Sequence, residues 1–111
     1  MALQISSRLT FVGSIRPGNT IEARWIAGHP METGLRGDDL GRRIPRNIIV
    51  QARVLLDGKL MFEFEPGTGM SANPYLAFGL TVPPQGGIVS VHWLDDNGQR
   101  GSVQQILLLE K

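Results

Sequence analysis

The chain of 111 residues contains no cysteine. That absence excludes disulfide bonds, metal sites built from thiolates, iron–sulfur clusters and any covalent thiol chemistry on this chain itself. Long apolar runs are also missing, because the longest candidate is the short stretch 106–109 and a membrane span needs about 20 residues. The first residues do not show the charged and then apolar pattern of a secretory signal. On these features alone we expect a cytoplasmic protein without a membrane partner.

An excess of charge of either sign is missing as well. Eleven Lys and Arg residues stand against ten Asp and Glu residues, which gives a formal net charge of +1. A protein that binds the phosphates of nucleic acid normally carries a clear excess of basic residues. We therefore do not expect nucleic acid as a partner.

What the chain does have is a globular composition rich in turn formers. Hydrophobic residues make up 41% and charged residues 19%, which is typical of a folded domain rather than a disordered segment. The length fits a single domain over residues 1–111, because domains commonly contain about 100–150 residues. Fourteen Gly and seven Pro residues at short intervals favour short strands joined by turns over long helices.

Apolar and polar residues alternate between the turn formers along most of the chain. Alternation with a period of two is the pattern of a strand that buries one face. Seven such segments in one short chain predict an all-β fold, an immunoglobulin-like antiparallel β-sandwich of about seven strands, here without the disulfide of antibody domains. The predicted strands cover residues 8–14, 20–27, 48–56, 59–65, 75–82, 88–95 and 101–109.

The alternation also predicts which side chains face the core. In the second strand, Ile21, Ala23 and Trp25 share one face. Trp25 and Trp93 are expected to anchor the core from the two sheets. His92 is out of phase with the core positions around it, so we expect it to face solvent or an interface.

The clearest hairpin lies in the middle of the chain. Asp57 and Gly58 predict a type I′ turn between two alternating segments. In the strand that follows, Leu60, Phe62 and Phe64 are expected to point inward.

Residues 28–43 interrupt the alternation with a loop that is longer than compact domains usually tolerate without a purpose. Because the loop contains His29 and several carboxylates, a metal or acid–base site has to be considered. The spacing suits such a site poorly, since Pro30 argues against the helix that would bring His29 and Glu32 onto one face. Two interpretations remain: a small-ligand or metal site at His29, or a structural role in which His29 and Pro30 fix how the chain leaves its strand.

No residue pattern predicts catalysis, and we expect neither an enzyme nor a bound cofactor. No Ser lies in the Gly-x-Ser-x-Gly turn of a hydrolase nucleophile. Asn73, Pro74 and Tyr75 open a strand with a rigid aromatic segment. This segment either packs at the rim of the sandwich or forms a contact surface for a partner.

Four segments together resemble the SoxZ family. They are His-Pro-Met-Glu-Thr-Gly-Leu-Arg at residues 29–36, Ile-Pro at 44–45, Asn-Pro-Tyr-Leu-Ala-Phe at 73–78, and the turn that runs from Trp93 to Gly98. Their order and spacing agree over essentially the whole chain. The string at 29–36 is far more specific than a lone glycine pattern.

The resemblance implies a heterodimer with SoxY, whose thiol carries the sulfur intermediates of thiosulfate oxidation. It further implies a non-catalytic scaffold in the periplasm, exported together with SoxY, on which other Sox enzymes dock transiently. When isolated, such a chain is expected to self-associate as a homo-oligomer through the surface meant for SoxY. The residues expected at the partner surface are His29, Pro30, Met31, Glu32, Thr33, Gly34, Leu35, Arg36, Asn73, Pro74 and Tyr75.

Overall fold

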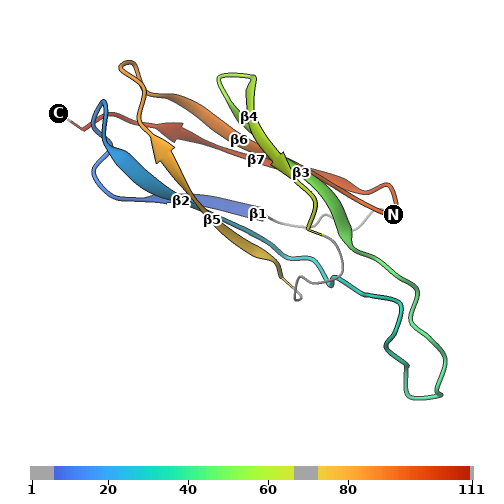
Figure 1. Ribbon diagram of the computed structural model, residues 1–111. Coiled ribbons are helices and arrows are strands. Elements are labelled where there is room, and N and C mark those ends of the chain that lie inside the picture. Colours follow the sequence, from blue (N-terminus) through green and yellow to red (C-terminus); the bar gives the residue numbers. More distant parts are fainter. Residues whose placement is uncertain (1–6, 67–72, 111) are drawn as a thin grey trace.

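In the part of the chain that the structure describes, seven strands form two antiparallel sheets that pack face to face (Figure 1). The computed structural model describes residues 7–66 and 73–110, and these ranges contain no helix, hence none that could cross a membrane. One sheet has the strand order β1-β2-β5 and the other β4-β3-β6-β7. The predicted all-β sandwich is therefore confirmed. The strands are β1 (Ser7–Val12), β2 (Thr20–Ala27), β3 (Ile49–Leu56), β4 (Lys59–Phe64), β5 (Tyr75–Thr81), β6 (Gly87–Asp95) and β7 (Arg100–Leu107).

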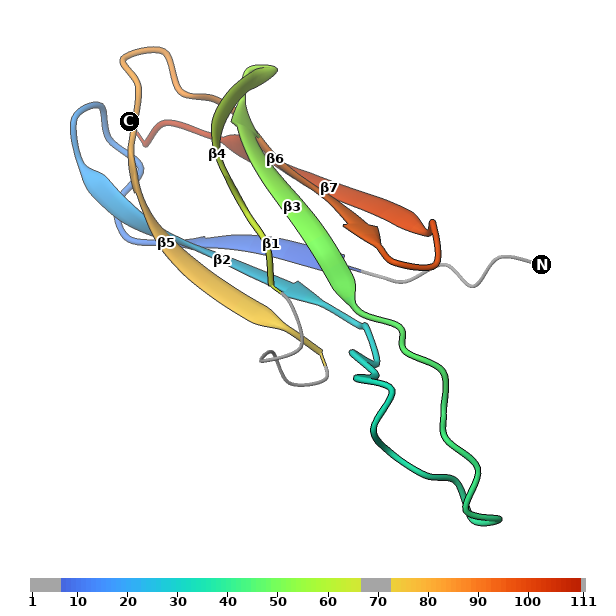
Figure 2. The same cartoon turned by 45° about the vertical axis from the view of Figure 1, so that its right-hand side comes forward.

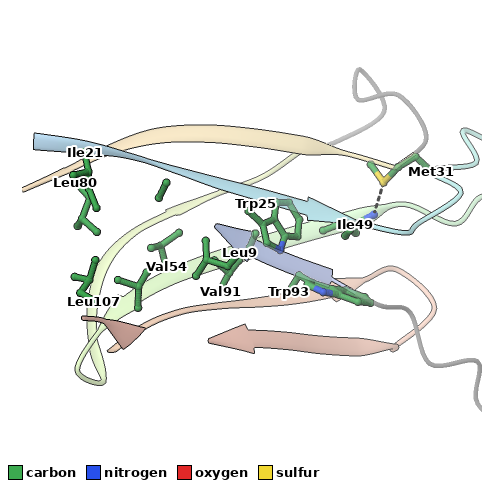
Figure 3. Close-up of a cluster of buried hydrophobic side chains, with 14 of the residues drawn as sticks. Leu9, Ile21, Trp25, Met31, Ile49, Val54, Leu80, Val91, Trp93 and Leu107 are labelled. Atoms are coloured by element: carbon green, nitrogen blue, oxygen red, sulfur yellow. Dashed lines mark hydrogen bonds between the residues drawn. The ribbon is translucent and has the colours of Figure 1, made fainter. Parts of the chain in front are cut away.

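The inward faces of both sheets fill the space between them. In β2, Ile21, Ala23 and Trp25 are buried as predicted, and the residues between them are less buried or exposed. Figure 3 shows Trp25 beside Leu9 in the middle of the core, with Trp93 nearer one end. Both tryptophans are buried, so each removes a large apolar area from water, which is the main stabilising contribution in a domain of this size.

Trp93 packs closely against β7 because the residue opposite it is a glycine. Trp93 and Gly101 are direct partners in the β6–β7 register. A Cβ added at Gly101 would lie 2.2 Å from Cζ2 of the Trp93 ring, far inside van der Waals contact. The preceding residue, His92, points to the opposite face of β6 and is exposed, as the alternation predicts.

The central hairpin forms where the sequence predicts it, with one exception. Asp57 and Gly58 have φ angles of 51° and 80°, the positive values that a type I′ turn requires. Phe62 and Phe64 pack against the core. The expectation that Leu60 points inward is wrong, because Leu60 is 55% exposed. The β3–β4 pairing shifts register after Val54, and this irregularity changes the phase of the alternation before Phe62.

Residues 28–47, called the arm from here on, extend away from one end of the sandwich (Figures 1 and 2). Glu32 and Asn47 exchange two backbone hydrogen bonds, of 2.7 and 2.8 Å, that join the two legs of the arm. Near the tip, the backbone N–H of Asp38 donates to the carbonyl of Arg42 (2.7 Å). The radius of gyration is 16.2 Å, against about 13 Å for a compact domain of roughly 100 residues. The interruption predicted at 28–43 is thus a hydrogen-bonded projection.

Gly101→Ala should lower the free energy of unfolding by about 1–3 kcal/mol, because the added methyl group forces the Trp93 ring out of its place. Urea denaturation followed by tryptophan fluorescence measures this change. Gly79→Ala in β5 is the control, since the nearest atom to its new Cβ is Cγ2 of Thr20 at an ordinary 3.8 Å. The control should change stability by less than about 0.5 kcal/mol. Equal losses in both variants would contradict the tight contact at Gly101.

Candidate functional site

The two sequence segments predicted to form a partner surface meet at the base of the arm. His29 lies two residues after the end of β2, and Asn73 and Pro74 precede β5, which pairs with β2. The backbone N–H of Asn73 donates to the carbonyl of His29 (2.7 Å), and that of Ala27 donates to the carbonyl of Pro74 (3.1 Å). The β2–β5 pairing therefore brings together two motifs that are far apart in the sequence.

His29 is buried at this point and makes a hydrogen bond between the two sheets. Its Nε2 lies 3.1 Å from Oδ2 of Asp95, at the end of β6, and both side chains are fully buried. Nδ1 of His29 accepts the backbone N–H of Met31 at 3.0 Å. Because Nδ1 is an acceptor, the ring proton is on Nε2 and is donated to Asp95. The imidazole and the Trp93 ring pack edge to face, with their centroids 5.9 Å apart.

These bonds bear on the alternative of a ligand or metal site at His29. Both ring nitrogens of His29 are already engaged inside the domain, so the ring can bind a metal only by giving up one of these bonds. Among residues 7–66 and 73–110, no group of three or more His, Cys, Asp or Glu side chains is arranged to hold a metal ion. The contacts correspond instead to the structural interpretation, in which His29 fixes how the chain leaves β2.

Asp95 organises the β6–β7 turn as well as the His29 contact. Its Oδ1 accepts the backbone N–H groups of Asn97 (3.0 Å) and Gln99 (2.8 Å). Together with His29, these donors give the buried carboxylate three partners, which is what a charge removed from water needs. Sequence reasoning missed this role, because the only available signal was an acidic residue at the start of a turn.

Asp96 attaches the returning leg of the arm to the same turn. Its Oδ1 accepts the backbone N–H of Ile48 (3.0 Å), and its own N–H donates to the carbonyl of Ile48 (2.9 Å). Its Oδ2 accepts Nε of Arg46 (2.8 Å). Asp95 and Asp96 thus hold the two legs of the arm, one through His29 and the other through Arg46 and the adjoining Ile48.

Met31 closes the end of the core beneath the arm. Its φ angle is 49°, a left-handed conformation that is uncommon for a residue other than glycine. Its Sδ accepts the backbone N–H of Ile49 at 3.3 Å, the bond drawn dashed in Figure 3. The side chain is 5% exposed and belongs to the core. Met31 therefore contributes packing at the arm base.

The candidate residues divide into buried and exposed sets. His29, Met31 and Pro74 are buried, so they support the surface from beneath and do not form it. Among the exposed candidates, Leu35 is 76% exposed on the arm and Tyr75 is 51% exposed at the start of β5. The other residues of the candidate surface that are exposed or partly exposed are Pro30, Glu32, Thr33, Gly34, Arg36 and Asn73.

An ion pair stiffens the outgoing leg of the arm. Both side-chain oxygens of Glu32 accept hydrogen bonds from the guanidinium of Arg36, and the Nε bond is 3.2 Å long. These hydrogen bonds lower the pKa of the Glu32 carboxyl and raise the pKa of Arg36. The charged form of the pair is therefore favoured when the arm is folded.

The Glu32 carboxyl should titrate below the range of an ordinary glutamate. The stabilisation from its pair with Arg36 is then fully present above the ordinary range and is lost as pH falls through the lowered pKa. Carbon-detected NMR titration of the side-chain carboxyl measures this pKa. Arg36→Gln should raise it, whereas Arg42→Gln, which removes the partner of Asp38, should not. An unmoved pKa in Arg36→Gln would sink this assignment.

His29→Ala should lower the free energy of unfolding by about 1.5–3 kcal/mol, because it leaves the buried Asp95 carboxylate without one of its hydrogen-bond donors. Thermal and urea unfolding measure the loss. His92→Ala is the matched control, since it removes an exposed histidine whose side-chain partner is Ser90 on the same strand. The free energy of unfolding of the control should stay within about 0.5 kcal/mol of that of the unmodified protein. A His29→Ala protein as stable as the control would show that the buried bond contributes nothing.

Solved structures share this fold at low sequence identity. A superoxide reductase (neelaredoxin) from Ignicoccus hospitalis superposes with a TM-score of 0.68 and 12% identity, covering 95% of this chain and 80% of that chain. A putative superoxide reductase from Thermotoga maritima superposes with a TM-score of 0.66 and 11% identity, covering 95% of this chain and 86% of that chain. A hypothetical protein from Pyrococcus horikoshii has a TM-score of 0.60 and 11% identity, and the match covers 92% of this chain and 85% of that chain. At these identities the likeness concerns the fold alone.

The family comparison is more specific. No curated protein matches the chain. A family model described as "Sulphur oxidation protein SoxZ" matches residues 12–105, a range that contains the whole arm and the segment at 73–75. The match covers well over half of the sequence and includes every residue of the candidate surface. The chain therefore belongs to the SoxZ family of sulphur oxidation proteins.

Proposed function

We propose that this chain is the non-catalytic scaffold subunit of a sulfur carrier. In this proposal it pairs with SoxY, and a cysteine of SoxY bears the sulfur intermediates of thiosulfate oxidation. The SoxZ family match is the observation that carries the proposal. The sequence adds that the chain has no cysteine, so a covalent sulfur intermediate has to be bound elsewhere.

The geometry of the arm base supports a scaffold role. The buried histidine and the two acidic residues beside it use their polar atoms to hold the arm on the sandwich. A group already committed to internal hydrogen bonds is poorly placed to exchange protons with a substrate. The arm itself exposes Leu35 and Leu40, each 76% accessible, together with several arginines. Exposed apolar and Arg side chains on a projection are suited to contact with a protein partner.

The location that follows from this function is the periplasm. SoxY would supply the export signal, and the folded pair would cross the membrane together. Other Sox enzymes would then dock on the pair transiently, with the arm as one available contact surface.

Mixing the chain with SoxY should produce a stable heterodimer. Because SoxY binds the folded chain and not the unfolded one, the unfolding midpoint of the chain should rise by several degrees as SoxY is added. Size-exclusion chromatography with light scattering, and calorimetry over a range of SoxY concentrations, measure the two effects.

The same mixture tests where sulfur is bound. After incubation with thiosulfate and the Sox enzymes, intact-mass spectrometry should find an adduct on SoxY and an unchanged mass for this chain. An adduct on this chain that survives desalting, or the absence of any complex with SoxY, would overturn the proposed function.

A further inference from the structure

The four edge strands of the sandwich differ in how well they are covered. β1 and β7 lie next to each other and close one side, and the N–H of Glu110 adds a hydrogen bond to the carbonyl of Ile15 (2.9 Å). β4 and β5 form the opposite side, and in the described residues each pairs with a single strand. Side chains rather than backbone bridge this side, with Phe62 and Phe78 in edge contact at a centroid distance of 5.1 Å.

β5 is also the edge strand without charge. Its sequence is Tyr-Leu-Ala-Phe-Gly-Leu-Thr, whereas β1 contains Arg8, β4 contains Lys59 and Glu63, and β7 contains Arg100. Natural edge strands are commonly protected from unwanted pairing by charged side chains, by proline or by a covering segment. β5 has no charge or proline, and within residues 7–66 and 73–110 only β2 pairs with it, along one edge. An uncharged edge of this length is suited to pairing with another strand.

Hydrogen bonds at both ends of β5 determine which backbone groups point to its free edge. Ala27 donates to the carbonyl of Pro74, and Val82 donates to the carbonyl of Asn19, so the even-numbered positions face β2. Antiparallel pairs alternate along the strand, and the register between these ends is regular. The N–H and C=O groups of the odd-numbered residues therefore point away from β2. These residues are Tyr75, Ala77, Gly79 and Thr81.

The side chains of β5 limit what can pair there. On the inner face, Leu76 and Phe78 are partly buried and pack against the core. A neighbouring strand would place its own inward side chains against this apolar surface, where an unpaired charge is costly. On the outer face, Ala77 and Gly79 are small and leave space for larger side chains on the neighbour.

We propose that the free edge of β5 binds an extended, uncharged strand of SoxY and so continues the β1-β2-β5 sheet into the partner. This inference rests on the proposed function, because it names the surface through which that heterodimer forms. Main-chain hydrogen bonds from the odd-numbered residues of β5 supply the affinity, and apolar side chains at alternate positions of the SoxY strand supply the specificity. Tyr75 and its cross-strand neighbour Ile26, both exposed, extend the contact on the outer face.

A second copy of this chain fits the edge less well. Antiparallel self-pairing that uses most of β5 places Ala77 opposite Ala77 or Gly79. Such small pairs contribute little cross-strand contact, and pairing strength comes largely from those contacts. A SoxY strand with larger outward side chains avoids this weakness.

Backbone hydrogen exchange measured by NMR tests the inference without any substitution. In the isolated chain the amides of Ala77 and Gly79 should exchange rapidly, while those of Phe78 and Leu80, which face β2, should be protected. Adding SoxY should slow exchange at Ala77 and Gly79 at least tenfold. If SoxY binds and these two amides keep exchanging at the rate measured in the isolated chain, the inference is wrong and the proposed function stands.

A proline substitution gives the second test. Ala77→Pro removes an N–H that faces the free edge and no hydrogen bond to β2, so the domain should fold and SoxY affinity should fall at least tenfold. Ala77→Val keeps the N–H at the same exposed position and should bind as the unmodified chain does. Should Ala77→Pro fail to fold, the exchange measurement alone decides.

Leu35→Asp on the arm separates the two candidate surfaces. We expect it to leave SoxY affinity unchanged. Loss of SoxY binding in Leu35→Asp together with normal binding by Ala77→Pro would overturn the inference in favour of the arm. Protection of Ala77 and Gly79 that appears at high concentrations of the chain alone, and not with SoxY, would identify a second copy as the occupant and would also overturn it. Absence of any complex with SoxY would remove the proposed function itself.

Discussion

The buried hydrogen bond between His29 and Asp95 is the contact on which the arrangement of this molecule most depends. Apolar packing holds two sheets together but specifies their relative position only loosely, whereas a buried donor and acceptor have one satisfactory geometry. This bond joins the segment that follows β2 in one sheet to the last residue of β6 in the other. His29 is the second residue of the arm, and the returning leg is held by Asp96, so the bond attaches the arm at the point where it leaves the sandwich.

Local pattern was enough to predict most of the fold. The strands of the sandwich follow from alternation and from turn formers such as Asp57 and Gly58, because both signals act over a few neighbouring residues. Leu60 was predicted wrongly for a related reason. Its orientation depends on a register shift against β3, and the apolar run Leu60-Met61-Phe62 does not by itself show which of its residues faces outward.

The candidate site was predictable in composition but not in its division into buried and exposed residues. The string at residues 29–36 looked more specific than folding requires. In the structure, folding itself explains why His29 and Met31 stand at these positions. His29 is hydrogen-bonded to the buried Asp95, and Met31 packs at the end of the core. The partner of His29 is far away in the sequence and belongs to the other sheet, so no local pattern could identify it. An unusual string is therefore weak support for a contact surface until the burial of each residue is known.

In the proposed scaffold role, the chain acts through the surfaces it offers to its partners. The arm offers side chains, and recognition there depends on the identity of residues such as Leu35. The free edge of β5 offers mainly backbone groups, and its side chains need only be uncharged and small or apolar. Recognition through backbone tolerates substitution better than recognition through side chains, because every residue except proline provides the same donor and acceptor. In the proposed complex the two surfaces would thus have different tasks: the edge would bind a permanent partner that continues the sheet, and the arm would bind enzymes that have to be distinguished from one another and released.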